Sequence, residues 1–462
     1  MNDSLRSDSF GALNSPRRWL FVAAVCLTLG LALGVECHAL GLNGPQYWQW
    51  PWRKLDGVRL IAGFAVALVP FIASQWLFAA GKISLWRALA LLMLTTFLLQ
   101  LVALAAQTAD LSLARLAQLV ESPSATSYFT EATRLHAQNI SLRDWLDKFP
   151  SFSGRLALHA QTKPPGPILF YLLFVHLFGP GDAAAAVGGL SIAILATCSV
   201  PATAFFIRAL TGDVTRGFWG ASFLALCPGL VLFLPELDQL YPILTCGLLG
   251  CWALALRTEK MPWACACGVV LGLTCFATYS LLTLGSWMLG LAMLAITGPE
   301  HLGFSRLAKM AAATLASFAA VQLSLAWSLH FDPLATFFAA LRNQAILLQH
   351  VARPYPATVL FDLTDFAMGA GWLGGALALL GAWRGSPNVR RVSFLCLAQL
   401  LLVAVLALLP GETARVWLFM LPLLMVPLDA EMTRLSARQR VLAFGIVTVA
   451  MTAICRNMVF IA

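Results

Sequence analysis

Lys163 lies between a polar segment and the short apolar run 168–178. An unpaired charge beside an apolar run is costly, so such a lysine needs an anionic partner. The segment Pro164-Pro165-Gly166-Pro167 follows it, and a proline in the first turn of a helix pre-sets the helical φ. The helix over 168–178 therefore presents N–H groups and a positive dipole end to Lys163, which suits an anion. The competing interpretation is a proline-capped helix start with a lysine that reaches the membrane surface.

Three carboxylates have spacings that allow either chemistry or a structural role. Glu236 and Asp238 follow Pro235 in a turn between two apolar runs. Asp238 could cap the next helix, or it could face a cavity as a general base or metal ligand. Glu131 could act as a base, or it could pair with Arg134 three residues later on the same helix.

Candidate anion-binding groups accompany these acids. Arg353 and Arg415 lie at the ends of apolar runs, where each could clamp a phosphate through two N–H groups or contact lipid head groups. His159 precedes Lys163 by four residues. We predict no bound metal from the motifs, because no HxxH, HExxH or Cys/His cluster is present. The eleven cysteines lie mostly in apolar runs and are expected to be buried as small hydrophobic residues.

The composition sets the class of protein that must position these groups. The 462 residues are 60% hydrophobic and 11% charged, with a mean hydropathy of +0.80, which is typical of an all-α polytopic membrane protein. The formal net charge is +9, but the Lys and Arg residues are spread thinly between apolar runs, which argues against binding to nucleic acid.

The positions of Lys and Arg predict the topology. The run 168–178 is too short to span a membrane. If it does not cross, five basic turns share the cytoplasmic side with Arg17-Arg18, as the positive-inside rule requires; if it crosses, all five move outside. We therefore predict that 168–178 is a half-helix that enters the membrane from the outer side. The protein is expected to be a multi-pass protein of the cell (inner or plasma) membrane, with its N-terminus in the cytoplasm. About 13 spans are expected, over 19–40, 58–80, 86–107, 184–209, 216–235, 239–256, 262–280, 281–297, 308–328, 364–384, 392–409, 415–430 and 440–460.

This topology divides the chain into six parts and places most tyrosines at the outer edge. Short juxtamembrane helices are expected over 111–120, 128–137, 141–149 and 332–350. The predicted parts are a cytoplasmic tail (1–18), three spans (19–107), an outer loop with juxtamembrane helices and the half-helix (108–183), central spans (184–328), a second outer loop (329–363) and C-terminal spans (364–462). The tyrosines at the outer edge include Tyr128 and Tyr355, which could line an outer cavity.

Three motifs occur in an order that resembles the GT-C membrane glycosyltransferases. Tyr128-Phe129-Thr130-Glu131-Ala132 precedes Thr162-Lys163-Pro164-Pro165, and His176-Leu177-Phe178-Gly179 ends the half-helix. A downstream Asp238 opens a later span. The resemblance is to the family 39-like branch of protein O-mannosyltransferases and lipid A aminoarabinose transferases. It covers residues 110–260 well and the rest only in layout.

The resemblance implies sugar transfer from a polyprenyl-phosphate donor to an acceptor hydroxyl at the outer face, by inverting displacement with a carboxylate base. Glu131 and Asp238 are then the predicted catalytic residues. The substrate-binding residues are expected to be Tyr128, His159, Lys163, Glu236, Arg353, Tyr355 and Arg415. The family's acidic residue before the loop tyrosine is replaced here by Ser124 and Ala125, which leaves the base open among nearby acids.

The expected partners are the lipid-linked donor and membrane lipid. The sequence does not identify the cofactor, although a divalent cation stays open, and it does not reveal the oligomeric state. Two other classes of function remain as alternatives. One is a flippase or transporter for a lipid-linked substrate, and the other is an inactive GT-C scaffold that binds lipid.

Overall fold

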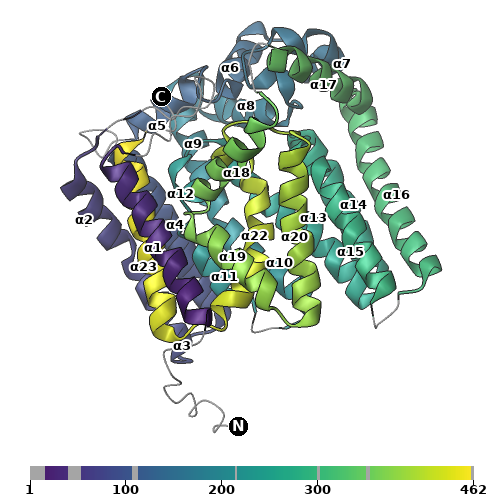
Figure 1. The fold of residues 1–462 in the computed structure, drawn as a ribbon. Coiled ribbons are helices and arrows are strands. Elements are labelled where there is room, and N and C mark those ends of the chain that lie inside the picture. Colours follow the sequence, from purple (N-terminus) through teal and green to yellow (C-terminus); the bar gives the residue numbers. More distant parts are fainter. Residues whose placement is uncertain are drawn as a thin grey trace.

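The computed structural model describes residues 16–39, 52, 54–106, 113–213, 216–298, 302–349 and 354–458, and the named elements within them are all helices. Long helices stand side by side, and a layer of shorter helices covers their upper end (Figure 1). The chain is thus an all-α polytopic membrane protein, as the composition predicts.

The first helices form one flank of the bundle. They are α1 (Pro16–Glu36), α2 (Gly57–Ala67), α3 (Val69–Ala79) and α4 (Leu85–Ala105). The end of α1 meets the end of the last helix, α23 (Ala437–Asn457), where Arg456 pairs with Glu36 and Asn457 donates to the same carboxylate over 2.7 Å. Charged side chains at the end of a membrane helix are costly unless they are paired, and this contact pairs Arg456 with Glu36.

Four helices follow at the upper end: α5 (Ala114–Glu121), α6 (Tyr128–Gln138), α7 (Leu142–Phe152) and α8 (Gly166–Phe178). With α17 (Pro333–Gln349) they form the covering layer in Figure 1. The amphipathic segments predicted over 111–120, 128–137, 141–149 and 332–350 are therefore helices, with bounds shifted by a few residues. Helix α8 has 13 residues and is apolar, and it is shorter than a membrane span, as predicted for the half-helix.

The central and C-terminal helices make up the rest of the bundle. The central ones are α9 (Asp182–Thr197), α10 (Ser199–Thr211), α11 (Phe218–Leu224), α12 (Pro228–Leu232), α13 (Tyr241–Thr258), α14 (Met261–Ala277), α15 (Gly285–Thr297) and α16 (Phe304–Leu329). After α17 come α18 (Ala357–Gly369), α19 (Leu373–Arg384), α20 (Pro387–Val405), α21 (Thr413–Val416) and α22 (Leu421–Met432). Short 3-10 turns connect some of them: η1 (Ser153–Arg155), η2 (Ala160–Thr162), η3 (Leu237–Leu240), η4 (Ser280–Leu284) and η5 (Leu418–Met420).

Nine helical stretches in the described part of the chain are long and apolar enough to span a membrane, or ten if one bent pair is a single span. All nine coincide with predicted runs. The other four predicted runs differ because prolines and glycines divide or shorten them. Pro228 starts α12 and separates it from α11, α18 and α19 bend by 100° at Gly371, and α14 and α22 are shorter than the nine.

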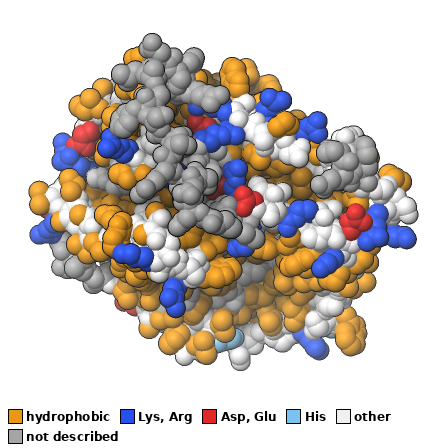
Figure 2. Space-filling view, turned by 90° about the horizontal axis from the view of Figure 1, so that it is seen from below, with side chains coloured by type: hydrophobic (Ala, Val, Ile, Leu, Met, Phe, Trp, Pro, Cys, Tyr) orange, Lys and Arg blue, Asp and Glu red, His pale blue; other side chains and the backbone are white. Residues whose placement is uncertain are grey.

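The basic turns lie together at the lower end of the bundle, in agreement with the prediction that they share one side of the membrane. Arg257 donates to the carbonyl of Arg208 over 2.9 Å. Arg216 lies 3.8 Å from Asp429, and Arg384 lies 2.8 Å from Glu431. Figure 2 looks at this end and shows Lys and Arg side chains spread between hydrophobic ones. The contacts place these turns together at one end, opposite the layer that carries α8.

Candidate functional site

The predicted site residues Lys163, Glu236, Asp238 and Arg415 lie together at the upper end. The Arg415 guanidinium lies 2.9 Å from a Glu236 carboxylate oxygen, and both side chains are buried. The Lys163 ammonium lies 5.5 Å from the centre of the Tyr241 ring. The charge of Asp238 raises the pKa of Lys163, Glu236 and Arg415, so Asp238 lies near all three. We call these four residues, together with Tyr241, the upper cluster.

The segment before α8 fixes the position of Lys163. At Gly166, a Cβ atom would come within 2.2 Å of the carbonyl oxygen of Phe276, so only glycine lets α8 start this close to the end of α14. Asn343 of α17 donates to the carbonyl of Gln161 over 2.8 Å and holds η2 just before the lysine. Within the described part of the chain, the Lys163 ammonium has no carboxylate within ion-pair distance. It therefore keeps N–H donors that an anion could use.

Two aspartates of α18 hold the turn that carries Arg415. The Asp362 carboxylate accepts from the N–H of Gly411 over 2.8 Å, and Asp365 accepts from the N–H of Ala414 over 2.9 Å. Close backbone contact supports the same turn, because a Cβ atom on Gly369 would lie 2.9 Å from the carbonyl of Ala414. The bend between α18 and α19 thus serves to present Arg415 next to Glu236.

The charges of the cluster are unequally satisfied. The two arms of Arg415 contact Glu236 and Glu412, of which Glu412 is half exposed. Burial raises the pKa of Glu236 to about 7, although Arg415 opposes the shift. Burial lowers the pKa of Lys163, and Asp238 opposes that change. Near neutral pH the two carboxylates that balance Arg415 are therefore partly protonated, as Glu236 is, or exposed, as Glu412 is.

Asp238 does not cap the helix that follows it. The N-terminal residues before η3 and α13 make no side-chain capping bond. Among the described residues, the Asp238 carboxylate makes no hydrogen bond or ion pair, and the side chain is partly exposed. The structure therefore does not support the helix-cap interpretation of this acid, and its role as a base stays a prediction.

Glu131 has a different environment. One of its carboxylate oxygens accepts from Arg134 over 2.8 Å and from the N–H of Ala157 over 2.8 Å. Ser127 accepts from the N–H of Ala160 over 3.1 Å, so α6 holds the segment 157–160 at two points. These contacts tie α6 to the chain that leads to Lys163. The catalytic role predicted for Glu131 stays a prediction, and its contacts are those of a positioning residue.

Removal of the Glu131 carboxylate is expected to lower the stability of the folded protein rather than the rate of the reaction. Glu131→Ala leaves the partly buried N–H of Ala157 without an acceptor, which should cost about 1 kcal/mol, the lower end of the range for such a group. Glu131→Gln keeps an acceptor oxygen and should behave nearly as wild type. Thermal unfolding of the two variants in detergent measures the difference, and equal melting temperatures would contradict this role.

Tyr128 and His159 border the upper cluster. Burial raises the pKa of Tyr128 well above its usual value, and Asp238 and Glu236 add to that shift from nearby. Burial and the neighbouring Arg415 lower the pKa of His159 to about 4, so the imidazole is neutral at pH 7. Its Nε2 lies 3.3 Å from the carbonyl of Ser124. Both residues therefore lie beside the cluster, and their role in substrate binding stays a prediction.

The remaining predicted residues lie elsewhere. Arg353 lies outside the described residues. Tyr355 is 65% exposed just before α18, and among the described residues it makes no hydrogen bond with the cluster. Within the described part of the chain, no group of three or more His, Cys, Asp or Glu side chains could hold a metal ion.

Three residues beside the cluster were missed by the sequence analysis as functional groups. Asp362 and Asp365 are spaced three apart on one face of an apolar helix, a signal that could have marked them. Tyr171 of α8 is fully buried, and its hydroxyl has no hydrogen-bond partner among the described residues. Burial raises the pKa of Tyr171, and the charge of Glu236 adds to the shift, so the two groups are near each other.

No protein-family model matches this chain, and no curated protein sequence matches it. Among solved structures, the chain is similar to the crystal structure of ArnT from Cupriavidus metallidurans in the apo state, with 14% sequence identity and a TM-score of 0.41. The match covers 65% of this chain and 56% of that chain, so this chain spans little more than half the length of ArnT. A similarity of this extent assigns neither a family nor an activity to this chain.

Proposed function

We propose that the protein is a membrane glycosyltransferase of the GT-C type, which moves a sugar from a polyprenyl-phosphate donor to an acceptor hydroxyl at the outer membrane surface. The observation that carries this proposal is the upper cluster. Among the described residues, it joins an ammonium without an ion-pair partner, that of Lys163 just before the half-helix α8, and a carboxylate without a hydrogen bond, that of Asp238 in η3. The resemblance of the Lys163-Pro164-Pro165 motif and its neighbours to the GT-C enzymes supports the same class.

The cations of the cluster suit the phosphate of such a donor. Lys163 offers three N–H donors, and Arg415 can offer a planar pair once the exposed Glu412 is displaced. The far end of α8 exposes Leu173, Leu177 and Phe178. Apolar surface of this kind can lie against lipid tails, so the donor can bring its phosphate to Lys163 while its chain stays in the bilayer.

In the proposed step, the acceptor oxygen attacks the anomeric carbon while Asp238 takes the hydroxyl proton. The bond between the anomeric carbon and the phosphate oxygen breaks, and both electrons leave with the lipid phosphate. Lys163 and Arg415 stabilise the charge that develops on that oxygen. A single displacement of this kind inverts the anomeric centre.

An assay of the purified full-length protein with a panel of polyprenyl-phosphate sugars tests this function. Transfer to an acceptor, or slow release of the sugar to water, supports the enzyme. Binding of the donor without any turnover would favour an inactive scaffold, and movement of intact donor across vesicles would favour a flippase.

Donor binding is expected to weaken as the pH rises through about 7, where Glu236 becomes charged. The ionised carboxylate competes with the phosphate for Arg415, so affinity should fall by at most about tenfold per pH unit above that pKa. Titration with a polyprenyl phosphodiester, whose own charge is constant over this range, measures the effect. Glu236→Gln keeps the shape of the side chain and should flatten the profile. A wild-type profile without any slope would contradict the assignment.

The positive-inside rule puts the lower end in the cytoplasm and the upper cluster outside. Single cysteines that replace Gly212 and Ser386, in two lower turns, should therefore resist an impermeant thiol reagent in intact cells and react after the cells are opened. Labelling of both from outside would reverse the orientation and place the cluster in the cytoplasm.

A further inference from the structure

A hollow lies at the lower end of the bundle, opposite the upper cluster. Its volume is about 400 Å³. It lies between the ends of α10, α13, α15, α20 and α22, at the face that Figure 2 shows. Residues lining it include Arg216, Arg257, Leu291, Leu294, Arg391 and Val426. Its position at the end of the membrane helices puts it at the boundary between hydrocarbon and water.

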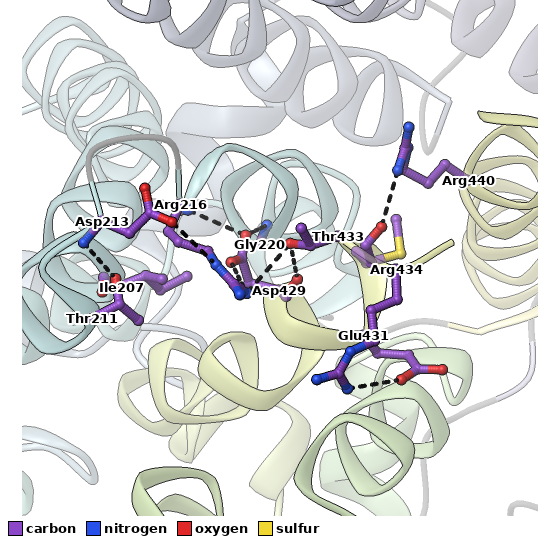
Figure 3. Close-up of polar contacts among 12 residues, drawn as sticks. Ile207, Thr211, Asp213, Arg216, Gly220, Asp429, Glu431, Thr433, Arg434 and Arg440 are labelled. Carbon is purple, nitrogen blue, oxygen red and sulfur yellow. Dashed lines mark hydrogen bonds and ion pairs between the residues drawn. The ribbon is translucent and has the colours of Figure 1, made fainter. Parts of the chain in front are cut away.

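The arginines of this hollow are positioned but incompletely neutralised. Figure 3 shows Arg216 between Asp213 and Asp429, at distances of 3.7 and 3.8 Å. The buried Asp429 carboxylate also accepts from the N–H groups of Gly217 and Gly220, over 3.2 and 3.0 Å. Asp429 therefore fixes both the start of α11 and Arg216. Two carboxylates lie beside Arg216, so the positive field of the hollow comes mainly from its other two arginines.

Two further arginines have no carboxylate partner in the described part of the chain. Arg257 donates one N–H to the carbonyl of Arg208, and its other donors are not used by any acid. Arg391 is exposed on the first turns of α20 and makes no ion pair there. Glu259, also in the wall, is paired with Arg306 over 3.3 Å. The hollow thus offers guanidinium groups to an anion from outside the chain.

Apart from the charged residues and the polar side chains of Thr211 and Asn388, the wall is apolar. Leucines of α13 and α15 face valines of α20 and α22 across it. A soluble anion would gain nothing from such a wall, whereas a molecule with a phosphate and a hydrocarbon chain would gain from both surfaces. Lipids of this chemistry are present in the leaflet that this end of the bundle adjoins.

We propose that this hollow binds one anionic phospholipid of the adjoining leaflet, with its phosphate on Arg216, Arg257 and Arg391 and the start of an acyl chain along the leucine wall. Anionic lipids attract basic residues near the cytoplasmic surface, which agrees with the predicted orientation. The site is separate from the upper cluster and does not depend on the reaction there.

Native mass spectrometry of the full-length protein in detergent, titrated with phosphatidylglycerol and with phosphatidylcholine, tests the proposal. Wild type should retain one phosphatidylglycerol in preference to phosphatidylcholine. Arg391→Ala should weaken that binding about fivefold, the effect of one arginine near a charged lipid surface. Arg390→Ala is the matched control, because Arg390 is the exposed neighbour on α20 that does not line the hollow. Equal losses of phosphatidylglycerol binding in the two variants would show that the effect comes from general surface charge, and would overturn the proposal.

Two further measurements separate the lipid from a free anion. Ala295→Phe adds bulk to the wall without changing the charge and should also weaken binding. Millimolar inorganic phosphate should leave the bound phosphatidylglycerol in place. Displacement by phosphate, together with normal binding in Ala295→Phe, would identify a site for a soluble anion and overturn the assignment to lipid.

Discussion

Asp238→Asn is expected to lower the rate of sugar transfer by about 10²–10⁴-fold, the range over which a general base contributes. Asparagine keeps the size of the side chain and loses the ability to accept the acceptor's proton. Because Asp238 makes no hydrogen bond or ion pair among the described residues, the substitution should leave the fold intact. Single-turnover transfer with saturating donor measures the chemical step, and donor binding measured on the same sample should change little.

Glu131→Gln provides the matched control, since Glu131 is the other acid near Tyr128 that the sequence proposes as the base. Its carboxylate holds the N–H of Ala157, and glutamine can still accept that bond. The variant should therefore transfer sugar at nearly the wild-type rate. The reverse pattern, an active Asp238→Asn and an inactive Glu131→Gln, would move the catalytic role to Glu131.

The elements that local sequence determines were predicted well. Amphipathic spacing located α6 and α7, because a helix that lies on a surface must separate its apolar and polar residues. The shortness of the run behind Pro167, with the distribution of arginines, separated α8 from the membrane spans. Both inferences depend on neighbours in the sequence, so they did not need the fold.

The contacts of the site depend on segments far apart in the chain. The sequence placed Arg415 and Glu236 at the same end of the bundle, but it did not reveal their ion pair or the support from Asp362 and Asp365. These contacts arise where the bend near Gly371 and the break before Pro228 bring backbone segments close together. Proline and glycine mark such breaks in a sequence, but the direction of the chain after a break is set by tertiary packing.

Lys163→Ala is expected to reduce transfer by about 10²–10³-fold, comparable to the loss of one donor that stabilises charge in a transition state. The ammonium should meet the lipid phosphate both before and during bond cleavage, so donor affinity should fall together with the rate. Arg415→Ala is a less direct test, because it would leave the buried Glu236 without its partner and lower stability. Among the described residues, Lys163 has no carboxylate at ion-pair distance, so its removal separates function from folding.

Lys82→Ala is a suitable control for that experiment. Lys82 also lies over an aromatic ring, 4.4 Å from the centre of Trp76. It belongs to the turn between α3 and α4, and Figure 1 shows the end of α3 at the lower end of the bundle. Both variants lose one positive charge and one contact with a ring, and only the Lys163 variant removes a cation from beside Asp238 and Arg415. Normal transfer in Lys82→Ala and a large loss in Lys163→Ala would connect activity to the upper cluster, whereas full activity in both would reject Lys163 as the phosphate ligand and the mechanism with it.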